Sequence, residues 1–232
     1  MIGVVIPAHN EEHHIGNALQ AIDAARRDPA LNGEAVEVMV VLDSCTDGTA
    51  AVAARHGATT SMVLARNVGT ARALGATAML AAGARWLAFT DADTTVSPTW
   101  LSAQLALDAD AVCGSIGVAD WSAHGEHAAL IEAHFLETYS DREGHRHIHG
   151  ANLGVSAEAY LRAGGFQALA CSEDVDLVQA LERSGARIAW SAAPRVLTSA
   201  RKDARAKGGF GDALLHAVAA RLAALPAVNP SC

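Results

Sequence analysis

Two kinds of apolar segment alternate along residues 1–100 of the chain. Short runs rich in Val, Ile and Leu, as in buried strands, are each followed by a segment whose apolar residues recur at helical spacing. The runs that predict strands are residues 2–8, 36–44, 60–65 and 85–93, and the segments that predict helices are residues 13–28, 48–57 and 67–83. This alternation predicts an α/β fold with a Rossmann-like, mostly parallel sheet flanked by helices.

A polar segment follows each of the four predicted strands. These segments are PAHNEE at residues 7–12, DSCTDGT at 43–49, RNVG at 66–69 and DADTT at 91–95. Because ligands of parallel sheets bind outside the carboxyl ends of the strands, we expect the four segments to converge on one binding cleft. Their carboxylates and hydroxyls suit a polyhydroxylated ligand that is bridged by a metal ion.

The carboxylates of Asp91 and Asp93 directly follow a segment that is predicted to be buried. Two carboxylates this close repel each other and are costly to desolvate, so they need a cation or access to water. The alternative is a turn with a helix N-cap, where Asp and Thr are both favoured. The pair alone leaves both explanations open.

Composition restricts the class of protein. A chain of 232 residues, of which 51% are hydrophobic, is long enough to form one α/β domain with a substantial core. The net charge of -8 argues against a nucleic-acid partner, because phosphate-backbone binding needs a basic surface. The four cysteines are widely spaced, which predicts neither a disulfide framework nor a CxxC site and favours a reducing cytoplasm.

No part of the chain predicts a membrane-spanning segment. Residues 1–12 have no basic leader and are better explained by a first strand. Residues 213–228 are interrupted by His216 and Arg221 and are too short to cross a bilayer. They predict an amphipathic helix that packs on the core or contacts a membrane surface, so we expect a cytoplasmic protein with at most peripheral membrane contact.

Two common phosphate-binding motifs are missing. No GxGxxG sequence follows the first predicted strand, and no GxxxxGK[ST] sequence occurs anywhere in the chain. Both motifs place backbone N–H groups around phosphates at the N-terminus of a helix. Their absence disfavours a dinucleotide-binding fold and a P-loop fold.

Four segments resemble the family 2 glycosyltransferases with the GT-A fold. They are VVIPAHNEE at residues 4–12, VVLDSCTDGTA at 40–50, ARNVGTARALGA at 65–76 and FTDADTTV at 89–96. The resemblance covers residues 1–100 and, less closely, the segment CSEDVDL at 171–177. It implies transfer of a sugar from a nucleotide-sugar donor to an acceptor hydroxyl, with a divalent metal ion and inversion at the anomeric carbon.

The resemblance also implies a role for individual residues. A nucleoside diphosphate leaves poorly unless a hard cation neutralises it, and Asp93 matches the direct ligand of that cation, Mn2+ or Mg2+. Asp91 would lie near the ribose or in the water shell of the metal. The nucleotide-binding residues that the resemblance implies are Pro7, Ala8, Asn10, Glu11, Asp43, Arg66, Gly69, Arg72, Asp91 and Ala92.

Two residues of this set have a second explanation. Asp43 would face the nucleobase, but it is alternatively a turn residue. Leu42 stands where family members often have a further acidic residue. This leaves UDP and GDP both open as the nucleotide. Arg72 would reach the diphosphate, but it is alternatively a solvated residue on its helix.

The acceptor half should supply a general base, because inversion is a direct displacement in which the acceptor hydroxyl loses a proton. Glu173 and Asp174 begin a segment with helical periodicity, residues 173–184, and match the Glu-Asp pair of the family. The resemblance makes Asp174 the base and Glu173 its support. The alternative is capping, since acidic residues are favoured in a first helical turn.

Three histidines, His145, His147 and His149, recur at every second position. In an extended segment such residues share one face, which permits a transition-metal site. The resemblance suggests instead that residues 149–156 line the acceptor pocket, with Asn152 bonding a sugar hydroxyl, and exposed histidines are a third possibility. We expect four other histidines to be surface residues, namely His13, His14, His124 and His127.

A basic segment, residues 195–207, interrupts the acidic second half of the chain. A solvated loop is one explanation. The other is a lid that closes over the diphosphate and excludes water, for which Arg201 and Arg205 are the candidates.

Together these patterns predict one glycosyltransferase domain, residues 1–232. Residues 1–100 would bind the nucleotide sugar, and residues 101–232 would bind the acceptor and carry the basic loop and last helix. Two other functions remain open, namely a sugar-phosphate nucleotidyltransferase and a non-catalytic protein that binds a sugar nucleotide or a metal. Neither the acceptor nor the oligomeric state can be read from the sequence.

Overall fold

The computed structural model describes residues 1–169 and 171–201. The chain divides into two compact units, and each is described by itself. Of the described residues, the first unit comprises 1–119, 140–169 and 171–199, and the second comprises 120–139 and 200–201.

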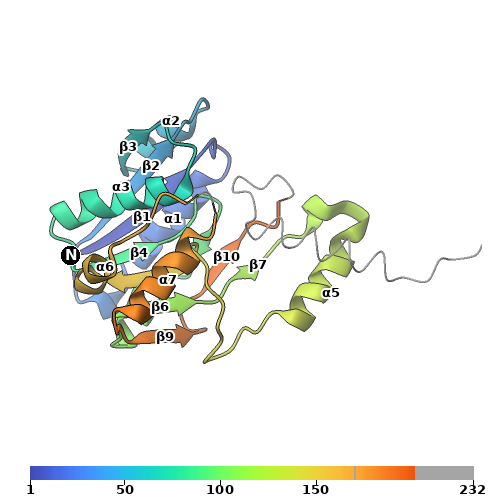
Figure 1. Cartoon of the computed structure of the whole chain (residues 1–232). Coiled ribbons are helices and arrows are strands. Elements are labelled where there is room, and N and C mark those ends of the chain that lie inside the picture. The colour runs from blue at the N-terminus through green and yellow to red at the C-terminus, as the bar shows by residue number, and fades with distance from the viewer. Residues whose placement is uncertain (170, 202–232) are drawn as a thin grey trace, which may run out of the picture. The chain divides into compact units, whose positions relative to one another are not determined.

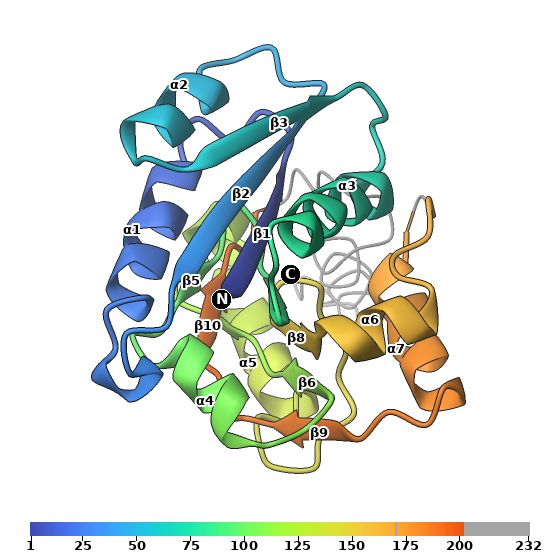
Figure 2. The same cartoon turned by 90° about the vertical axis from the view of Figure 1, so that its left-hand side faces the viewer.

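The first unit is built on a seven-stranded sheet with the strand order β3-β2-β1-β4-β8-β6-β9 (Figures 1 and 2). Its strands are β1 (Ile2–Ala8), β2 (Val36–Asp43), β3 (Thr59–Val63), β4 (Trp86–Phe89), β6 (Ala111–Gly114), β8 (Leu153–Ser156) and β9 (Ile188–Ser191). All neighbouring pairs are parallel except those of β8, which runs antiparallel to β4 and β6. The predicted mostly parallel sheet is therefore confirmed.

Helices cover both faces of this sheet. They are α1 (Ile15–Ala25), α2 (Thr49–Arg55), α3 (Val68–Ala81), α4 (Trp100–Ala106), α6 (Ala157–Ala163) and α7 (Glu173–Arg183), with a short 3-10 helix at Pro29–Leu31. In Figure 2, α1, α2 and α4 lie on one face and α3, α6 and α7 lie on the other. The periodicity correctly predicted the type and order of the first seven strands and helices, from β1 to β4.

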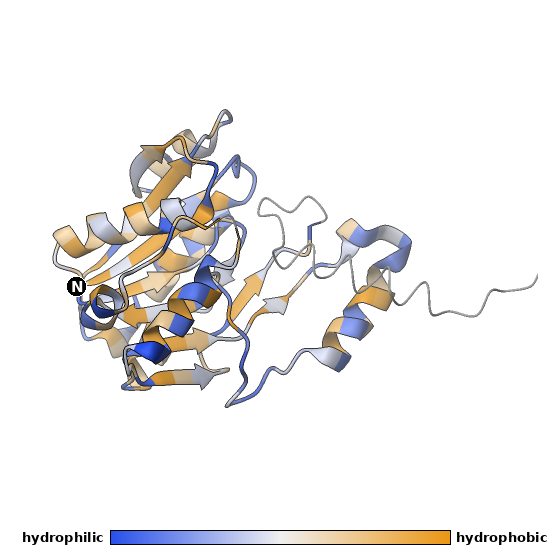
Figure 3. Cartoon of the chain, viewed as in Figure 1, coloured by the Kyte–Doolittle hydropathy of each residue, from blue (hydrophilic) through white to orange (hydrophobic). Residues whose placement is uncertain are grey.

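The core of the first unit lies on both faces of the central strands. Within β1, Val4 and Val5 are both completely buried although their side chains point to opposite faces. Figure 3 shows hydrophobic residues concentrated on the strands, whereas α7 carries many hydrophilic residues. Strands covered on both faces are continuously apolar, which explains why the sequence shows short unbroken runs of Val, Ile and Leu.

A second, three-stranded sheet in the same unit has the order β5-β10-β7. Its strands are β5 (Thr95–Val96), β10 (Val196–Thr198) and β7 (Gly117–Val118). The hydroxyl groups of Thr94 and Thr198 lie 2.9 Å apart and join the end of the Asp91–Asp93 segment to β10. This sheet ties residues late in the chain to the loop that follows β4.

In the second unit, the structure describes a 3-10 helix (Ser122–His127) followed by α5 (Ala128–Thr138). Trp121 and Phe135 pack together, and the ring of Phe135 stacks on Tyr139 at 4.6 Å. His124 is only 2% exposed, and its Nε2 lies 2.6 Å from the carbonyl oxygen of Ala200. The prediction that His124 is a surface residue is therefore wrong, because the aromatic cluster and this hydrogen bond bury its ring.

Some predictions concern residues outside the described ranges. They concern Arg205, the rest of the basic segment after residue 201, and residues 213–228. Among the residues that are described, no helix is both long enough and apolar enough to cross a membrane.

Candidate active site

The carboxyl ends of β1, β2 and β3 are followed by residues with unusual backbone angles. Asn10 has φ of 54°, Ser44 has 54° and Arg66 has 47°. A positive φ is costly for a residue other than glycine, and such strain is concentrated at binding and catalytic sites. Because the three strands are parallel neighbours, the strained residues lie along one edge of the sheet, which is the edge where the sequence predicted a binding cleft.

Hydrogen bonds join the loop after β1 to the loop after β2. The N–H of Glu12 donates to Asp47 at 3.1 Å, and the carboxylate of Glu12 accepts from the N–H of Gly48 at 2.7 Å. The side-chain oxygen of Asn10 accepts from the N–H of Thr46 at 2.8 Å. These bonds hold the two loops in one arrangement, so the segment from Pro7 to Glu11 is prepared before any ligand binds.

Asp43, at the end of β2, organises the loop after β3. Its two carboxylate oxygens accept hydrogen bonds from three successive backbone N–H groups, those of Ala65, Arg66 and Asn67, at 2.7 to 2.9 Å. Burial by itself raises the pKa of Asp43, but these donors and the hydroxyl of Ser44 outweigh it and lower the pKa. Asp43, which the sequence predicts to face the nucleobase, therefore also anchors the loop after β3.

The loop that Asp43 anchors presents Arg66 and begins α3. Arg66 is exposed. Asn67 is the N-cap of α3, and its side-chain oxygen accepts from the N–H of Thr70 at 2.9 Å. The loop thus places an exposed cation and a helix N-terminus side by side, which is an arrangement that suits an anionic group.

Arg72 lies one turn into α3 and is only 3% exposed. Its Nη2 donates to Asp91 Oδ1 at 2.6 Å, and its Nη1 donates to Glu173 Oε1. The ring of Phe166 lies 5.7 Å from the guanidinium carbon. Arg72 is therefore not a solvated helix residue, and two of its donors are already engaged by carboxylates.

Asp91 and Asp93 lie in the loop after β4, on either side of the buried Ala92. Both aspartates are partly exposed, which permits contact with a solvated cation. Carboxylate oxygens are the ligands that Mg2+ prefers, and one or two of them suffice when phosphates and water complete the shell. The donor set therefore fits such an ion, although no group of three or more His, Cys, Asp or Glu in the described ranges forms a metal site by itself.

Glu173 and Asp174 form the first turn of α7. Burial raises the pKa of Glu173, and the nearby Arg72 opposes this shift. Asp174 is half-buried, and its Oδ2 accepts from the N–H of Gly150 at 2.8 Å. Position in the first turn is consistent with helix stabilisation, but the bond to Gly150 also holds the Asp174 carboxylate against the segment that follows the histidines.

Two glycines allow the segments of the site to approach closely. A Cβ atom at Gly69 would lie 2.2 Å from the carbonyl oxygen of Gln167, and one at Gly150 would lie 2.4 Å from the guanidinium carbon of Arg72. Any side chain at either position would force backbone or a buried cation to move. Gly69 thus has a packing role between the start of α3 and the loop before α7, whatever its part in nucleotide binding.

The three alternating histidines form a column of rings. The centroids of His145 and His147 are 5.6 Å apart and those of His147 and His149 are 6.0 Å apart, with nearly parallel planes. The N–H of Ser140 donates to His147 Nε2 at 3.1 Å. Burial lowers the pKa of His149 to about 3, and the neighbouring histidines add to the shift. The predicted common face is confirmed, and His145 is buried rather than exposed.

Asn152 does not lie where a sugar could reach it. Its side chain is 1% exposed, accepts from Trp100 Nε1 at 2.9 Å, and donates to the carbonyl oxygens of Ser115 and Pro194. Asn152 therefore holds α4 and two loops together, and this geometry does not support the predicted bond to an acceptor hydroxyl.

The basic segment is described only in part. Arg195 forms an ion pair with Asp141, which also accepts from the hydroxyl of Ser115 at 2.6 Å. Arg201 is half-buried at the end of the described ranges, and Arg205 lies outside them. The lid remains a prediction.

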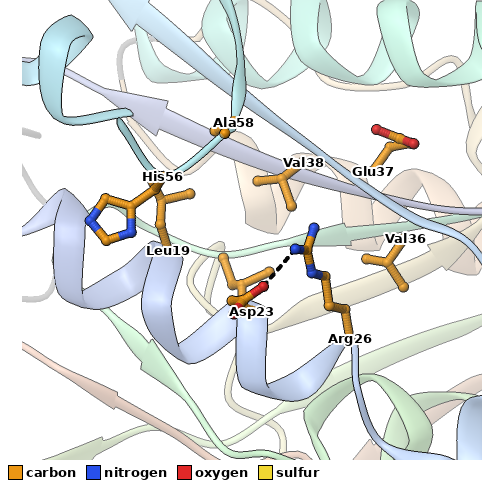
Figure 4. Close-up of a pocket in the computed structure, with 10 residues that line it drawn as sticks. Leu19, Asp23, Arg26, Val36, Glu37, Val38, His56 and Ala58 are labelled. Carbon is orange, nitrogen blue, oxygen red and sulfur yellow. Dashed lines mark ion pairs between the residues drawn. The ribbon is translucent and has the colours of Figure 1, made fainter. Parts of the chain in front are cut away.

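A separate pocket lies at the opposite end of β2 (Figure 4). Its lining comes from α1, β2 and the segment after α2, and comprises Leu19, Ile22, Asp23, Arg26, Val36, Glu37, Val38, His56, Gly57 and Ala58. Arg26 and Asp23, both in the lining, form an ion pair at 2.6 Å. Because Val36 begins β2 and Asp43 ends it, this pocket is distinct from the site at the carboxyl ends of the strands.

Comparisons with known proteins agree with this arrangement. Residues 3–162 match the sequence model of the family described as glycosyl transferase family 2. A comparison with curated protein sequences finds no match.

Three groups of solved structures are similar in fold. TarS 1–349 of S. aureus in complex with UDP-GlcNAc has a TM-score of 0.65 and 15% identity over 95% of this chain and 66% of that one. The mannosyltransferase PcManGT of Pyrobaculum calidifontis, in complex with GDP-Man and Mn2+, has a TM-score of 0.63 and 20% identity over 99% and 66%. Glucosyl-3-phosphoglycerate synthase of Mycobacterium tuberculosis, with Mn2+, UDP and glucosyl-3-phosphoglycerate, has a TM-score of 0.58 and 18% identity over 98% and 81%.

These similarities establish the GT-A fold for this chain. The chain spans just under two thirds of the length of the TarS and PcManGT chains. At 15 to 20% identity, the ligands of those proteins do not carry over to this chain by similarity alone.

Proposed function

Because the chain belongs to glycosyl transferase family 2 and is a glycosyltransferase, we propose that it transfers a sugar from a UDP- or GDP-sugar to an acceptor hydroxyl, with a divalent metal ion and inversion at the anomeric carbon. One observation carries the proposal. Asp91, Glu173 and Asp174 gather around Arg72, although Glu173 follows Arg72 by 101 residues. These contacts support the proposal that the predicted metal loop and the predicted base act in a single site.

Asp93 and Asp91 would hold Mn2+ or Mg2+ together with the diphosphate of the donor. The cation, when bound, neutralises the charge that develops on the leaving nucleoside diphosphate. Asp91 Oδ1 already accepts from Arg72, which leaves its second oxygen for the ribose or a metal-bound water. Asp93 remains the candidate for the direct ligand.

The loops after β1, β2 and β3 would bind the nucleoside and the diphosphate. Their cross-linking by hydrogen bonds reduces the conformational entropy that is lost when the nucleotide binds. Arg66 is better placed than Arg72 to meet a phosphate, because Arg66 is exposed and Arg72 is enclosed by two carboxylates. Asp43 retains a role in base recognition only through a lone pair that the loop amides leave unused.

Asp174 would take the proton of the acceptor hydroxyl. A base must lie within hydrogen-bond reach of the proton it removes, and the half-buried Asp174 combines partial exposure with a fixed orientation from Gly150. Glu173 is less suitable, because it is buried and paired with Arg72.

Two other functions are less well supported. A sugar-phosphate nucleotidyltransferase needs a glycine-rich, lysine-containing first loop, whereas residues 7–14 contain neither glycine nor lysine. A non-catalytic sugar-nucleotide or metal-binding protein would have no need of a carboxylate oriented as Asp174 is.

A binding panel tests the proposal. UDP, GDP and CMP are titrated into the protein with and without Mn2+, followed by hydrolysis assays on common UDP- and GDP-sugars in which water replaces the acceptor. We expect UDP or GDP to stabilise the protein against heat only when Mn2+ is present. Stabilisation by Zn2+ alone, with no response to any nucleotide, would contradict the proposed function.

A further inference from the structure

The guanidinium of Arg72 joins three segments that are far apart in the sequence. It extends from α3 and contacts Asp91 in the loop after β4 and Glu173 at the start of α7. The side chain of Arg72 is 4% exposed and that of Glu173 is 7% exposed. A buried charge must be paired, so neither partner can leave without a large energetic penalty.

The shape of the guanidinium makes this connection rigid. Its planar fork of N–H donors fixes the direction of each partner, unlike the single rotating ammonium of lysine. Phe166 covers the guanidinium, and Gly150 approaches it so closely that no Cβ fits between them. Arg72 is thus held from several sides, and its fixed guanidinium also fixes the position of the Glu173 carboxylate.

Gly150 connects the same group to Asp174. Its missing side chain leaves room for Arg72, while its N–H donates to Asp174 Oδ2 at 2.8 Å. The Asp174 carboxylate is therefore linked to Arg72 in two ways. One is its neighbour Glu173, paired with Arg72, and the other is the backbone of Gly150, packed against Arg72.

We propose that Arg72 is a positioning residue, which sets the place of the Asp174 carboxylate relative to Asp91 by holding Glu173 and the backbone at Gly150. The inference rests on the proposed function, in which Asp174 is the general base. It replaces the expectation that Arg72 binds the diphosphate directly. Arg72 contributes to the reaction by positioning Asp174, and the loops after β1, β2 and β3 determine the affinity for the nucleotide.

The principal variant is Glu173→Gln, which keeps the shape of the side chain and the contact between Arg72 and Asp91 while removing the charge that attracts Arg72. Arg72→Lys tests the same connection from the other side, because lysine keeps the charge and loses the fork. Arg85→Gln is the matched control, since Arg85 makes a two-point contact with Glu34 at the opposite end of β4.

Three measurements are made on each variant. They are the affinity for UDP and GDP with Mn2+, the kcat and KM for hydrolysis of the donor sugar that the wild type accepts, and the NMR shift and hydrogen exchange of the Gly150 amide. We expect Glu173→Gln and Arg72→Lys to lower kcat about 10- to 100-fold, to change nucleotide affinity less than about threefold, and to weaken protection of the Gly150 amide. Arg85→Gln should match the wild type in all three.

Contrary results are equally clear. A loss of nucleotide affinity with kcat intact in Arg72→Lys would mean that Arg72 contacts the nucleotide and is not a positioning residue. An unchanged Gly150 amide in both variants would mean that Asp174 does not depend on Arg72. If Arg72→Lys does not fold, Glu173→Gln decides the question alone.

The NMR measurement also separates this inference from the proposed function. It requires no substrate, so it is informative even if the wild type neither binds nucleotides nor hydrolyses any donor, which would be a failure of the proposed function.

A double variant tests whether Arg72 and Glu173 act together. If the double variant of Arg72→Lys and Glu173→Gln loses no more kcat than the less active of the two single variants, the two residues act through one connection. Fully additive losses would contradict it.

Discussion

Asp43 and Glu173 are both buried carboxylates of the same site, yet their pKa values shift in opposite directions. Asp43 accepts hydrogen bonds from three backbone N–H groups and one hydroxyl, and its pKa is lowered. Glu173 depends on the side chain of Arg72, which it shares with Asp91, and burial raises its pKa. At Asp43 the hydrogen-bond donors outweigh burial, whereas at Glu173 burial and the neighbouring carboxylates Asp174 and Asp91 outweigh the attraction of Arg72.

The comparison also separates two kinds of support. The N–H groups around Asp43 belong to one short loop, so they form as soon as that loop packs on β2. The support of Glu173 comes from a distant helix and can be lost by a single substitution. We therefore expect the loops after β2 and β3 to keep their structure when distant residues are substituted. Substitutions around Arg72, in contrast, should alter the position of the reacting carboxylates.

The largest expected effect is on turnover. Asp174→Asn keeps the shape of the side chain and removes its basicity, so kcat should fall by roughly two to four orders of magnitude while nucleotide affinity hardly changes. Melting temperature, nucleotide affinity and donor turnover are measured on this one variant. Helix capping alone predicts a loss of about 1 kcal/mol of stability with a near-normal rate per folded molecule, which would exclude Asp174 as the base.

The next effect concerns the metal. Asp93→Ala should abolish the Mn2+ dependence of UDP and GDP binding in calorimetry, because the cation loses its anionic protein ligand. Asp91→Ala should weaken binding less, although it also frees one side of Arg72. Unchanged metal-dependent affinity in the Asp93 variant would contradict the proposed role of the Asp-x-Asp pair.

A third prediction tests the robustness of the Asp43 side. Asp43→Ala leaves three backbone N–H groups without their acceptor and should cost about 3 kcal/mol of unfolding free energy. The pKa of Asp43 is lowered on folding, so its ionised form stabilises the folded protein. This contribution to the free energy of unfolding is present above the ordinary carboxyl pKa of about 3.9 and is lost as the pH falls below that value. Urea unfolding of the wild type and of Asp43→Ala should therefore differ most near neutral pH and converge in acid.

The smallest effect near neutral pH concerns the histidine column beside Gly150. The pKa of His149 is lowered to about 3 by burial and by His147 and His145, while Asp91 opposes the shift. The unfolded chain binds a proton near pH 6.5, so stability should fall as the pH decreases from about 6.5 towards 3, by up to about 1.4 kcal/mol per pH unit. His149→Asn should flatten this slope, and an unchanged slope in urea unfolding would show that His149 is protonated in the folded protein.

The sequence by itself determined the succession of strands and helices from β1 to β4 and the polar segments at the strand ends. Both are local properties, because the periodicity of a buried strand or an amphipathic helix is written in adjacent residues. The end of a strand is equally visible, since apolar residues give way to polar ones there. The edge of the sheet that carries the candidate site could thus be predicted before the structure was known.

Only the tertiary structure decided what the individual side chains contact. Arg72 looked like a solvated or diphosphate-binding residue, but it meets Asp91 and Glu173, which lie 19 and 101 residues further along the chain. Asn152 looked like a pocket residue, but it is buried and accepts a hydrogen bond from Trp100. Burial and pairing depend on which elements pack against each other. No local pattern contains that information, because the partners come from α3, the loop after β4, α4 and α7, which are far apart in the sequence.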